Sequence, residues 1–192
     1  VAIQSFIEVS MHKEIRIASL RAGNVIGGGD YAKNRIMTDL VNFELKNKKK
    51  LEIRNPDSIR PWQYVLDVVS GYISLAENLY KNEKFIGSYN FGPDQRLKKV
   101  KVEEIVEIFK NLAEIKKNKI TFKKNNLSNS KEEKTIYLDN KKVKKILKIK
   151  NKITNPKELI SRSLDIYKEL SLTNLKNIKN VYLKEINKYI NE

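Results

Sequence analysis

The stretch from Ile15 to Asp30 constrains the fold of this chain more than any other, because it joins an apolar run to three consecutive glycines. Its first six positions mix bulky apolar residues with small ones, a pattern that predicts a buried strand. Arg21 and Asn24 follow the run, and Gly27–Gly29 come next. Glycine allows positive φ and close approach by another molecule. Since ligands of open α/β sheets bind beyond the carboxyl ends of strands, we expect an open turn and a binding site here.

Two further motifs accompany this stretch. I-R-P-W-Q-Y-V-L-D covers Ile59–Asp67 after the turn N-P-D-S at Asn55–Ser58, and F-G-P-D covers Phe91–Asp94. With R-A-G-N-V-I-G-G-G-D at Arg21–Asp30, they resemble the C-terminal half of the sugar-nucleotide 4,6-dehydratases of the extended short-chain dehydrogenase/reductase family. The order R-A-G-N-V-I-G-G-G-D and then R-P-W-Q is similar to the CDP-glucose 4,6-dehydratases in particular. The resemblance extends over residues 1–147.

This resemblance implies an α/β fold in which short strands alternate with amphipathic helices, as in the C-terminal substrate-binding part of an extended short-chain dehydrogenase/reductase. The N-terminal Rossmann half is expected to be missing, because the sequence contains neither G-x-x-G-x-x-G nor G-x-G-x-x-G and starts inside an element. Tyr-x-x-x-Lys, the family's catalytic pair, occurs at Tyr80/Lys84 and Tyr137/Lys141. Neither pair leads into the Ile15 strand, so we attribute both to chance and assign no catalytic residue.

By resemblance, the intact enzyme binds NAD, oxidises the glucosyl C4 by hydride transfer, eliminates water across C5 and C6, and returns the hydride to C6. The chain is then a fragment that supplies the nucleotide-sugar half of the site and is inactive alone. Its partners are the nucleotide sugar and either an N-terminal half or a second copy in a homodimer. A fragment of another nucleotide-sugar epimerase or dehydratase is the first alternative. The family context suggests polysaccharide or O-antigen biosynthesis.

Five residues are candidates for substrate binding, because a diphosphate favours bidentate arginine and a sugar favours amides. Only seven arginines occur beside 32 lysines, so each arginine is informative. The resemblance places Asn24 near the sugar or first phosphate, Arg35 near the nucleotide, Arg54 in the base pocket, Arg60 on the diphosphate and Asn90 on the nucleotide side.

Other motif residues are expected to be structural. We expect Arg21 to support the loop and Trp62 to belong to the core. The sequence departs from the family beyond residue 125, where Lys131–Asp139 lacks the family's histidines, and Tyr64 stands where histidine is common. A ligand contact from this later region is therefore not predicted.

The net charge of +16 raises a second alternative, a basic nucleic-acid-binding module. Residues 1–115 carry 18 basic and 15 acidic side chains, whereas residues 116–192 carry 21 and 8. Lys, Asn and Ile, the residues of A/T-rich codons, make up 76 of the 192 positions, and the basic part lacks the aromatic interleaving of a nucleic-acid platform. Both observations argue against nucleic acid.

The length predicts one domain, with motif-bearing residues 1–115 and lysine-rich helical residues 116–192. Cysteine is absent and histidine occurs once, which excludes disulfides and a histidine or cysteine metal cluster. No apolar run is long enough for a membrane span, and there is no signal peptide, so we expect a cytoplasmic protein.

Apolar periodicity and capping residues predict the remaining elements. The helix over residues 67–80 is expected to bury Val69, Tyr72, Ile73, Ala76 and Leu79. Residues 125–134 are expected to form a loop or lid. The other expected elements are the end of a helix at 1–11, helices at 34–47, 102–112, 139–147 and 155–170, a helix in the last twenty residues, and strands at 51–54, 88–91 and 120–122.

Overall fold

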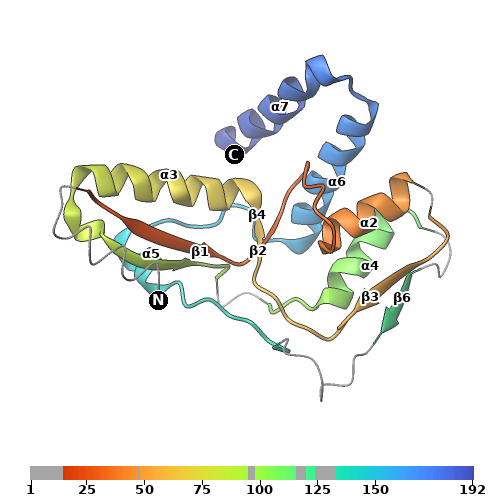
Figure 1. Ribbon diagram of the computed structural model, residues 1–192, viewed down its shortest axis with the longest axis horizontal. Helices are drawn as coiled ribbons and strands as arrows, with labels where there is room; N and C mark the ends of the chain where they lie inside the picture. The colour runs from red at the N-terminus through yellow and green to blue at the C-terminus, as the bar shows by residue number, and fades with distance from the viewer. Residues whose placement is uncertain (1–14, 47, 95–97, 116–119, 124–132) are drawn as a thin grey trace.

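A computed structural model describes residues 15–46, 48–94, 98–115, 120–123 and 133–192, in which parallel strand pairs alternate with helices (Figure 1). Among these residues, none of the helices combines the length and hydropathy that a bilayer crossing requires. The elements in chain order are β1 (Ala18–Ala22), β2 (Asn24–Ile26), α2 (Ile36–Leu45), β3 (Leu51–Arg54), β4 (Trp62–Tyr64), α3 (Val65–Lys81), η1 (Glu83–Phe85), β5 (Gly87–Phe91), α4 (Val102–Leu112), β6 (Ile120–Lys123), α5 (Lys141–Ile146), α6 (Pro156–Leu172), η3 (Leu175–Asn177) and α7 (Ile178–Asn191).

The strands pair in parallel as β1 with β5, β2 with β4, and β3 with β6. Parallel neighbours need a long crossover between them, and helices fill these crossovers. In Figure 1, α3 lies along the β1–β5 pair, whereas α2 and α4 lie beside the β3–β6 pair at the other end of the molecule. The observed architecture is therefore the predicted α/β fold with short strands.

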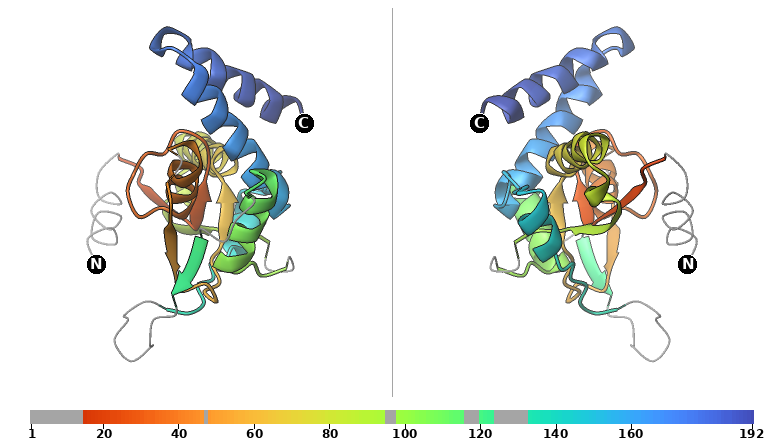
Figure 2. Two further views of the ribbon diagram at one scale, coloured as in Figure 1. Left: turned by 90° about the vertical axis from the view of Figure 1, so that its right-hand side faces the viewer. Right: turned by 90° about the vertical axis from the view of Figure 1, so that its left-hand side faces the viewer.

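The apolar core has two main parts. The larger one gathers residues of α2, β4, α4 and α6, and it includes the fully buried Leu40, Phe109 and Ile160. The smaller one lies between α3 and the β1–β5 pair, with Tyr89 and Phe91 at its centre. Figure 2 shows α6 running beside α4 to one end of the molecule, where the chain turns back into α7. Residues from both halves of the sequence thus share the larger core.

Several elements match their predicted bounds. The strand β3 and the helix α4 span the residues predicted for them. The apolar stripe of α4 buries Val102, Ile105, Val106 and Phe109, whereas Leu112, which the same periodicity places on it, is only half-buried. The helix α6 starts at Pro156, where the Asn155 side chain accepts a hydrogen bond from the Lys157 backbone N–H at 2.9 Å. Strong caps and a clear apolar stripe made these elements predictable.

Other predicted boundaries are wrong. The first strand begins at Ala18, and Ile15 is 57% exposed rather than buried. The helix after the glycine turn begins at Ile36, because Asn34 has a φ of +61° and therefore cannot be its cap. Asp139 accepts a hydrogen bond from the Lys141 N–H, but α5 starts only at Lys141. The predictions for residues 1–11 and for most of 125–134 lie outside the described residues.

The predicted inward face of α3 is also wrong. Val69, Tyr72 and Ile73 are 42–56% exposed, and the helix instead buries Asp67, Val68, Gly71 and Leu75. Asp67 does not cap the helix, which begins two residues earlier at Val65. The buried face includes a glycine and an aspartate, and a prediction that follows only the spacing of apolar side chains does not identify it.

Candidate functional site

A cleft of about 800 Å³ lies between the end of β2, the start of α2 and the strand β3. Pockets for small organic ligands commonly measure about 300–1,000 Å³, so the cleft is large enough for a nucleotide sugar. Four of the five predicted binding residues line it, namely Asn24, Arg35, Arg54 and Arg60. Asn90 is not among the described residues that line it.

Gly23 brings Asn24 to the cleft. At this residue the chain leaves β1, which pairs with β5, and enters β2, which pairs with β4. Gly23 donates its N–H to the Gln63 side-chain oxygen at 2.9 Å, and Asn24 donates its N–H to the Pro61 carbonyl at 2.9 Å. A Cβ on Gly23 would lie 2.2 Å from the Pro61 carbonyl oxygen, so a larger residue cannot make this switch.

Arg35 and Arg54 reach the cleft from two different elements. Arg35 is exposed at the N-cap of α2, directly after the left-handed Asn34. In β3, side chains alternate between the two faces, so Ile53 enters the core while Glu52 and Arg54 stay exposed at the cleft. Two cationic groups from different elements therefore line one cleft.

The cleft also carries acidic groups, namely Asp30, Asp39 and Glu52. Burial raises the pKa of Asp39 above its usual 3.8, although the cations Lys48 and Arg54 act in the opposite direction. The Glu52 carboxylate lies 3.7 Å from the Lys123 ammonium. An anionic ligand would therefore bind where the arginines gather, whereas amino or hydroxyl groups suit the acidic positions.

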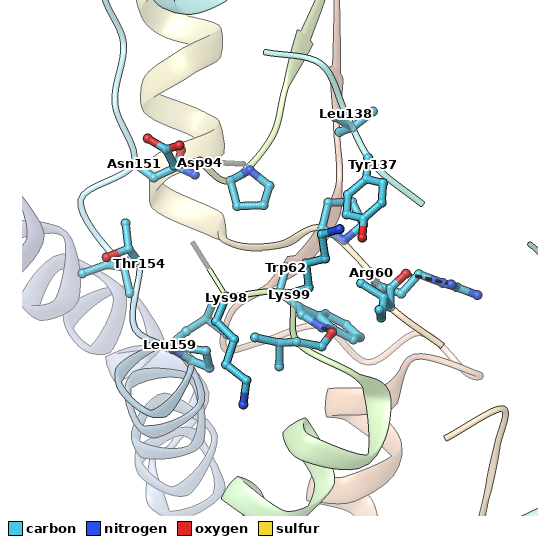
Figure 3. Close-up of a pocket in the computed structure, with 16 residues that line it drawn as sticks. Arg60, Trp62, Asp94, Lys98, Lys99, Tyr137, Leu138, Asn151, Thr154 and Leu159 are labelled. Atoms are coloured by element: carbon cyan, nitrogen blue, oxygen red, sulfur yellow. Dashed lines mark hydrogen bonds between the residues drawn. The ribbon is translucent and has the colours of Figure 1, made fainter. Parts of the chain in front are cut away.

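Arg60 is held in place by its surroundings. Arg60 is only 7% exposed, and Figure 3 shows its side chain beside Trp62. Its Nη1 donates hydrogen bonds to the carbonyls of Ile59 at 2.9 Å and Lys134 at 3.2 Å. Trp62 is 9% exposed and donates its indole N–H to the Val100 carbonyl at 3.0 Å. Trp62 thus belongs to the core, as predicted, and Arg60 is a fixed cation beside it.

A second, smaller cavity of about 70 Å³ shares Arg60 and Trp62 with the cleft (Figure 3). Its other walls are largely apolar, and the Lys99 ammonium lies 4.6 Å from the centre of the Tyr137 ring at its edge. A volume this small does not accommodate a nucleotide sugar. The larger cleft is therefore the candidate site.

The structure places two motif residues away from the cleft. Asn90 is half-buried in β5, where it is in register with Arg21 of β1. Arg21 is exposed and does not lie under the glycine loop, contrary to our expectation. β5 pairs with β1, whereas β2 pairs with β4, and Asn90 is not among the described residues that line the cleft.

The glycine turn is packed rather than open, which corrects the sequence-based expectation. A Cβ on Gly28 would lie 2.2 Å from Ile166 of α6, and one on Gly29 would lie 2.1 Å from the Tyr182 hydroxyl of α7. Gly29 has a φ of +87°, which suits glycine. The turn therefore serves close packing against the C-terminal helices.

The two Tyr-x-x-x-Lys matches lie outside the cleft. Tyr80 is 86% exposed near the end of α3, and Lys84 follows in η1. Tyr137 lines the small cavity, and Lys141 starts α5. Among the described residues that line the large cleft, neither pair is represented, in line with chance matches.

A buried polar network was missed at the sequence level. Arg162 of α6 is 5% exposed and pairs with Glu158 and Glu185, each at 3.0 Å, and with Glu192. Glu185 of α7 also accepts a hydrogen bond from the Tyr64 hydroxyl at 2.6 Å. Burial and this hydrogen bond raise the pKa of Tyr64. The sequence did contain one indication of this network: Arg162 is an arginine in a lysine-rich chain, and it follows Glu158 by four residues, the spacing of an ion pair on a helix.

Comparison with known proteins finds similarity over about half of the chain. Residues 2–92 match the NAD dependent epimerase/dehydratase family. The chain is 48% identical over 99 residues to the CDP-glucose 4,6-dehydratase of Salmonella typhimurium, and this alignment covers 50% of the chain and 27% of that enzyme.

Solved structures agree on the fold. The UDP-glucose 4-epimerase of Thermotoga maritima, solved with UDP-glucose, has a TM-score of 0.70 at 18% identity, over 89% of this chain and 52% of that one. The dTDP-glucose 4,6-dehydratase of Bacillus anthracis, solved with NAD, has a TM-score of 0.68 at 17% identity, over 91% and 50%. The chain spans about half the length of these structures. The chain is therefore similar to the NAD dependent epimerase/dehydratase family over residues 2–92 and CDP-glucose 4,6-dehydratase-like over the 99 aligned residues, and it shares its fold with these solved structures.

Proposed function

We propose that the chain forms the nucleotide-sugar-binding part of a CDP-glucose 4,6-dehydratase, an NAD-dependent lyase that converts CDP-glucose into CDP-4-keto-6-deoxyglucose and water. The similarity to the Salmonella enzyme supports this proposal over the aligned half. The single structural observation that carries it is the convergence of Arg35, Arg54, Arg60 and Asn24 on one cleft.

Each group in the cleft suits one part of this substrate. Guanidinium groups bind diphosphate oxygens through paired, charge-assisted hydrogen bonds. Arg60 is pre-ordered by its two backbone partners, so its binding loses little conformational entropy. Arg35 and Arg54 are exposed at the cleft and are free of the core, so their guanidinium groups can adjust to the phosphates. Asn24, exposed at the start of β2, offers an amide to a sugar hydroxyl.

NAD is the cofactor of this family. Dinucleotide phosphates bind where a glycine-rich turn presents backbone N–H groups at a helix N-terminus. Gly27–Gly29 do not fit that role, because Ile166 and Tyr182 occupy the space over Gly28 and Gly29. We therefore assign no NAD-binding or catalytic residue among the described residues, and we propose that the chain alone is inactive. Formation of CDP-4-keto-6-deoxyglucose from CDP-glucose and NAD by the chain alone would contradict this.

Titration calorimetry with CDP-glucose tests the binding role. Arg54→Ala removes one charge-assisted contact and is expected to weaken CDP-glucose about tenfold to a hundredfold. Arg21→Ala is the matched control, since Arg21 is also exposed but lies outside the cleft. Equal affinity of the Arg54 variant and the wild type for CDP-glucose would show that this cleft is not the nucleotide-sugar site.

Another nucleotide-sugar epimerase or dehydratase remains the alternative, because the fold is shared with proteins solved with UDP-glucose and UDP-glucuronic acid. The same titration with UDP-glucose and dTDP-glucose separates the two. The proposal expects CDP-glucose to bind at least tenfold more tightly than either. Preference for another base would instead favour the alternative.

A further inference from the structure

Tyr167 of α6 fixes the backbone of Asp30, at the end of the glycine turn. Its hydroxyl donates a hydrogen bond to the Asp30 carbonyl at 2.6 Å and accepts one from the Asp30 N–H at 3.0 Å. Tyr167 is only 2% exposed, and its ring meets that of Tyr31 edge-on at 6.1 Å. One side chain thus satisfies both backbone groups of a residue 137 positions away in the sequence.

Asp30 is a junction between three parts of the molecule. Its carbonyl accepts a second hydrogen bond, at 2.8 Å, from the hydroxyl of Thr38, which is buried in α2. Immediately before Asp30 in the sequence, Gly28 lies against Ile166 and Gly29 lies against Tyr182. The glycine turn, α2 and the C-terminal helices therefore meet at this backbone position.

This junction sits midway between two groups of the cleft. Asn24 lies six residues before Asp30 and Arg35 lies five residues after it, and all three line the cleft with Tyr167. A site on a loop is precise only when surrounding contacts lock that loop. We propose that Tyr167 is a positioning residue that orders the segment between Asn24 and Arg35 for the nucleotide sugar, an inference that rests on the function proposed above.

Tyr167→Phe removes only the hydroxyl and is the direct test. Without the hydroxyl, the segment between Asn24 and Arg35 becomes ordered only when the ligand binds, and binding then bears the entropic cost of ordering it. The Kd for CDP-glucose is therefore expected to rise about fivefold to tenfold. Tyr89→Phe is the matched control. Its hydroxyl is also buried and donates to a backbone carbonyl, that of Phe85 at 2.9 Å, but it lies under α3 away from the cleft. The control is expected to lower stability without changing the Kd.

A double-mutant cycle with Arg35→Ala distinguishes positioning from direct contact. If Tyr167 acts through the ordered segment, the fold-losses of the two variants do not multiply in the double variant, because the second change removes a contact already weakened. Losses that multiply fully would indicate a separate ligand contact and overturn the positioning role.

The outcomes also separate this inference from the proposed function. If the wild type binds CDP-glucose and Tyr167→Phe binds it equally well, the inference fails while the function stands. If the wild type binds none of the three nucleotide sugars, both fail. A loss in Tyr89→Phe equal to that in Tyr167→Phe would attribute the effect to general destabilisation and likewise refute the inference.

Discussion

The Asp67 carboxylate shows at the scale of one residue how a motif position serves the fold. It is buried in the first turn of α3 and accepts hydrogen bonds from the N–H groups of Lys152 at 2.7 Å and Ile153 at 3.2 Å. The Tyr189 hydroxyl of α7 donates a third at 2.8 Å. Burial raises the pKa of Asp67 above its usual 3.8, although these donors oppose the change. One carboxylate therefore joins α3, the segment before α6, and α7.

Asp67→Asn should change how stability depends on pH. Because the folded-state pKa of Asp67 is raised, the folded protein binds more protons than the unfolded chain above pH 3.8, and its stability falls as pH rises towards the raised value. Asparagine cannot titrate, so the free energy of unfolding of wild type minus variant should decline as the pH rises from 4 towards 7. Urea unfolding across this range measures it, with the exposed Asp165→Asn as control. A difference that grows with pH would contradict the assignment.

At the scale of elements, α3 shows where sequence patterns mislead. Its bulkiest apolar stripe, which includes Tyr72 and Ile73, points outward, and the helix approaches β5 through Gly71. A Cβ on Gly71 would lie 2.9 Å from the Phe91 ring. Periodicity counts apolar side chains, whereas close helix–sheet packing here selects a residue without one. By contrast, α4 has a single apolar stripe, and its bounds and face were predictable.

Gly71→Ala should therefore destabilise the chain. Alanine favours a helix by about 1 kcal/mol over glycine, but a methyl group against the Phe91 ring overpacks the core, which costs about 1–3 kcal/mol. We expect a net loss of about 1 kcal/mol in the free energy of unfolding. Glu77→Ala, on the exposed side of the same helix, should change it by less than about 0.5 kcal/mol. A stabilised Gly71 variant would show that the helix can shift.

Much of the candidate site follows from sequence, and the rest depends on contacts distant in the chain. Asn24, Arg35, Arg54 and Arg60 were named from the family resemblance, and all four line one cleft. Asn90 is not among the described residues that line it, and it lies in β5, which pairs with β1 and not with β2, a pairing that no local pattern records. The closed glycine turn and the bond between Tyr167 and Asp30 likewise arise only when α6 and α7 fold back.

At the scale of the whole molecule, the C-terminal helices are part of the body that carries the cleft. Arg162 of α6 meets Glu185 of α7, which also holds the Tyr64 hydroxyl in β4. Burial would lower the pKa of Arg162, but its hydrogen bonds to Glu192 and Glu185 raise it instead. Tyr64 follows Arg60 and Trp62, which line the cleft, and directly precedes α3. The network therefore connects the last helix to the segment that carries these two cleft residues.

Replacing Arg162 should therefore cost far more than breaking a surface pair. Arg162→Met keeps the length of the side chain but leaves Glu185, 13% exposed, without its cation, and losing one partner of a buried pair costs about 3–5 kcal/mol. We expect about 3 kcal/mol in urea unfolding, since part of Glu185 still reaches water. Lys184→Met breaks the exposed pair with Glu169 at 3.1 Å and should cost less than about 1 kcal/mol.

The double variant Arg162→Met/Glu185→Leu should recover part of the loss, because it removes the uncompensated charge. If the loss in the double variant equalled the sum of the losses in Arg162→Met and Glu185→Leu alone, the two residues would not be coupled, and this pair would not tie α7 to the cleft.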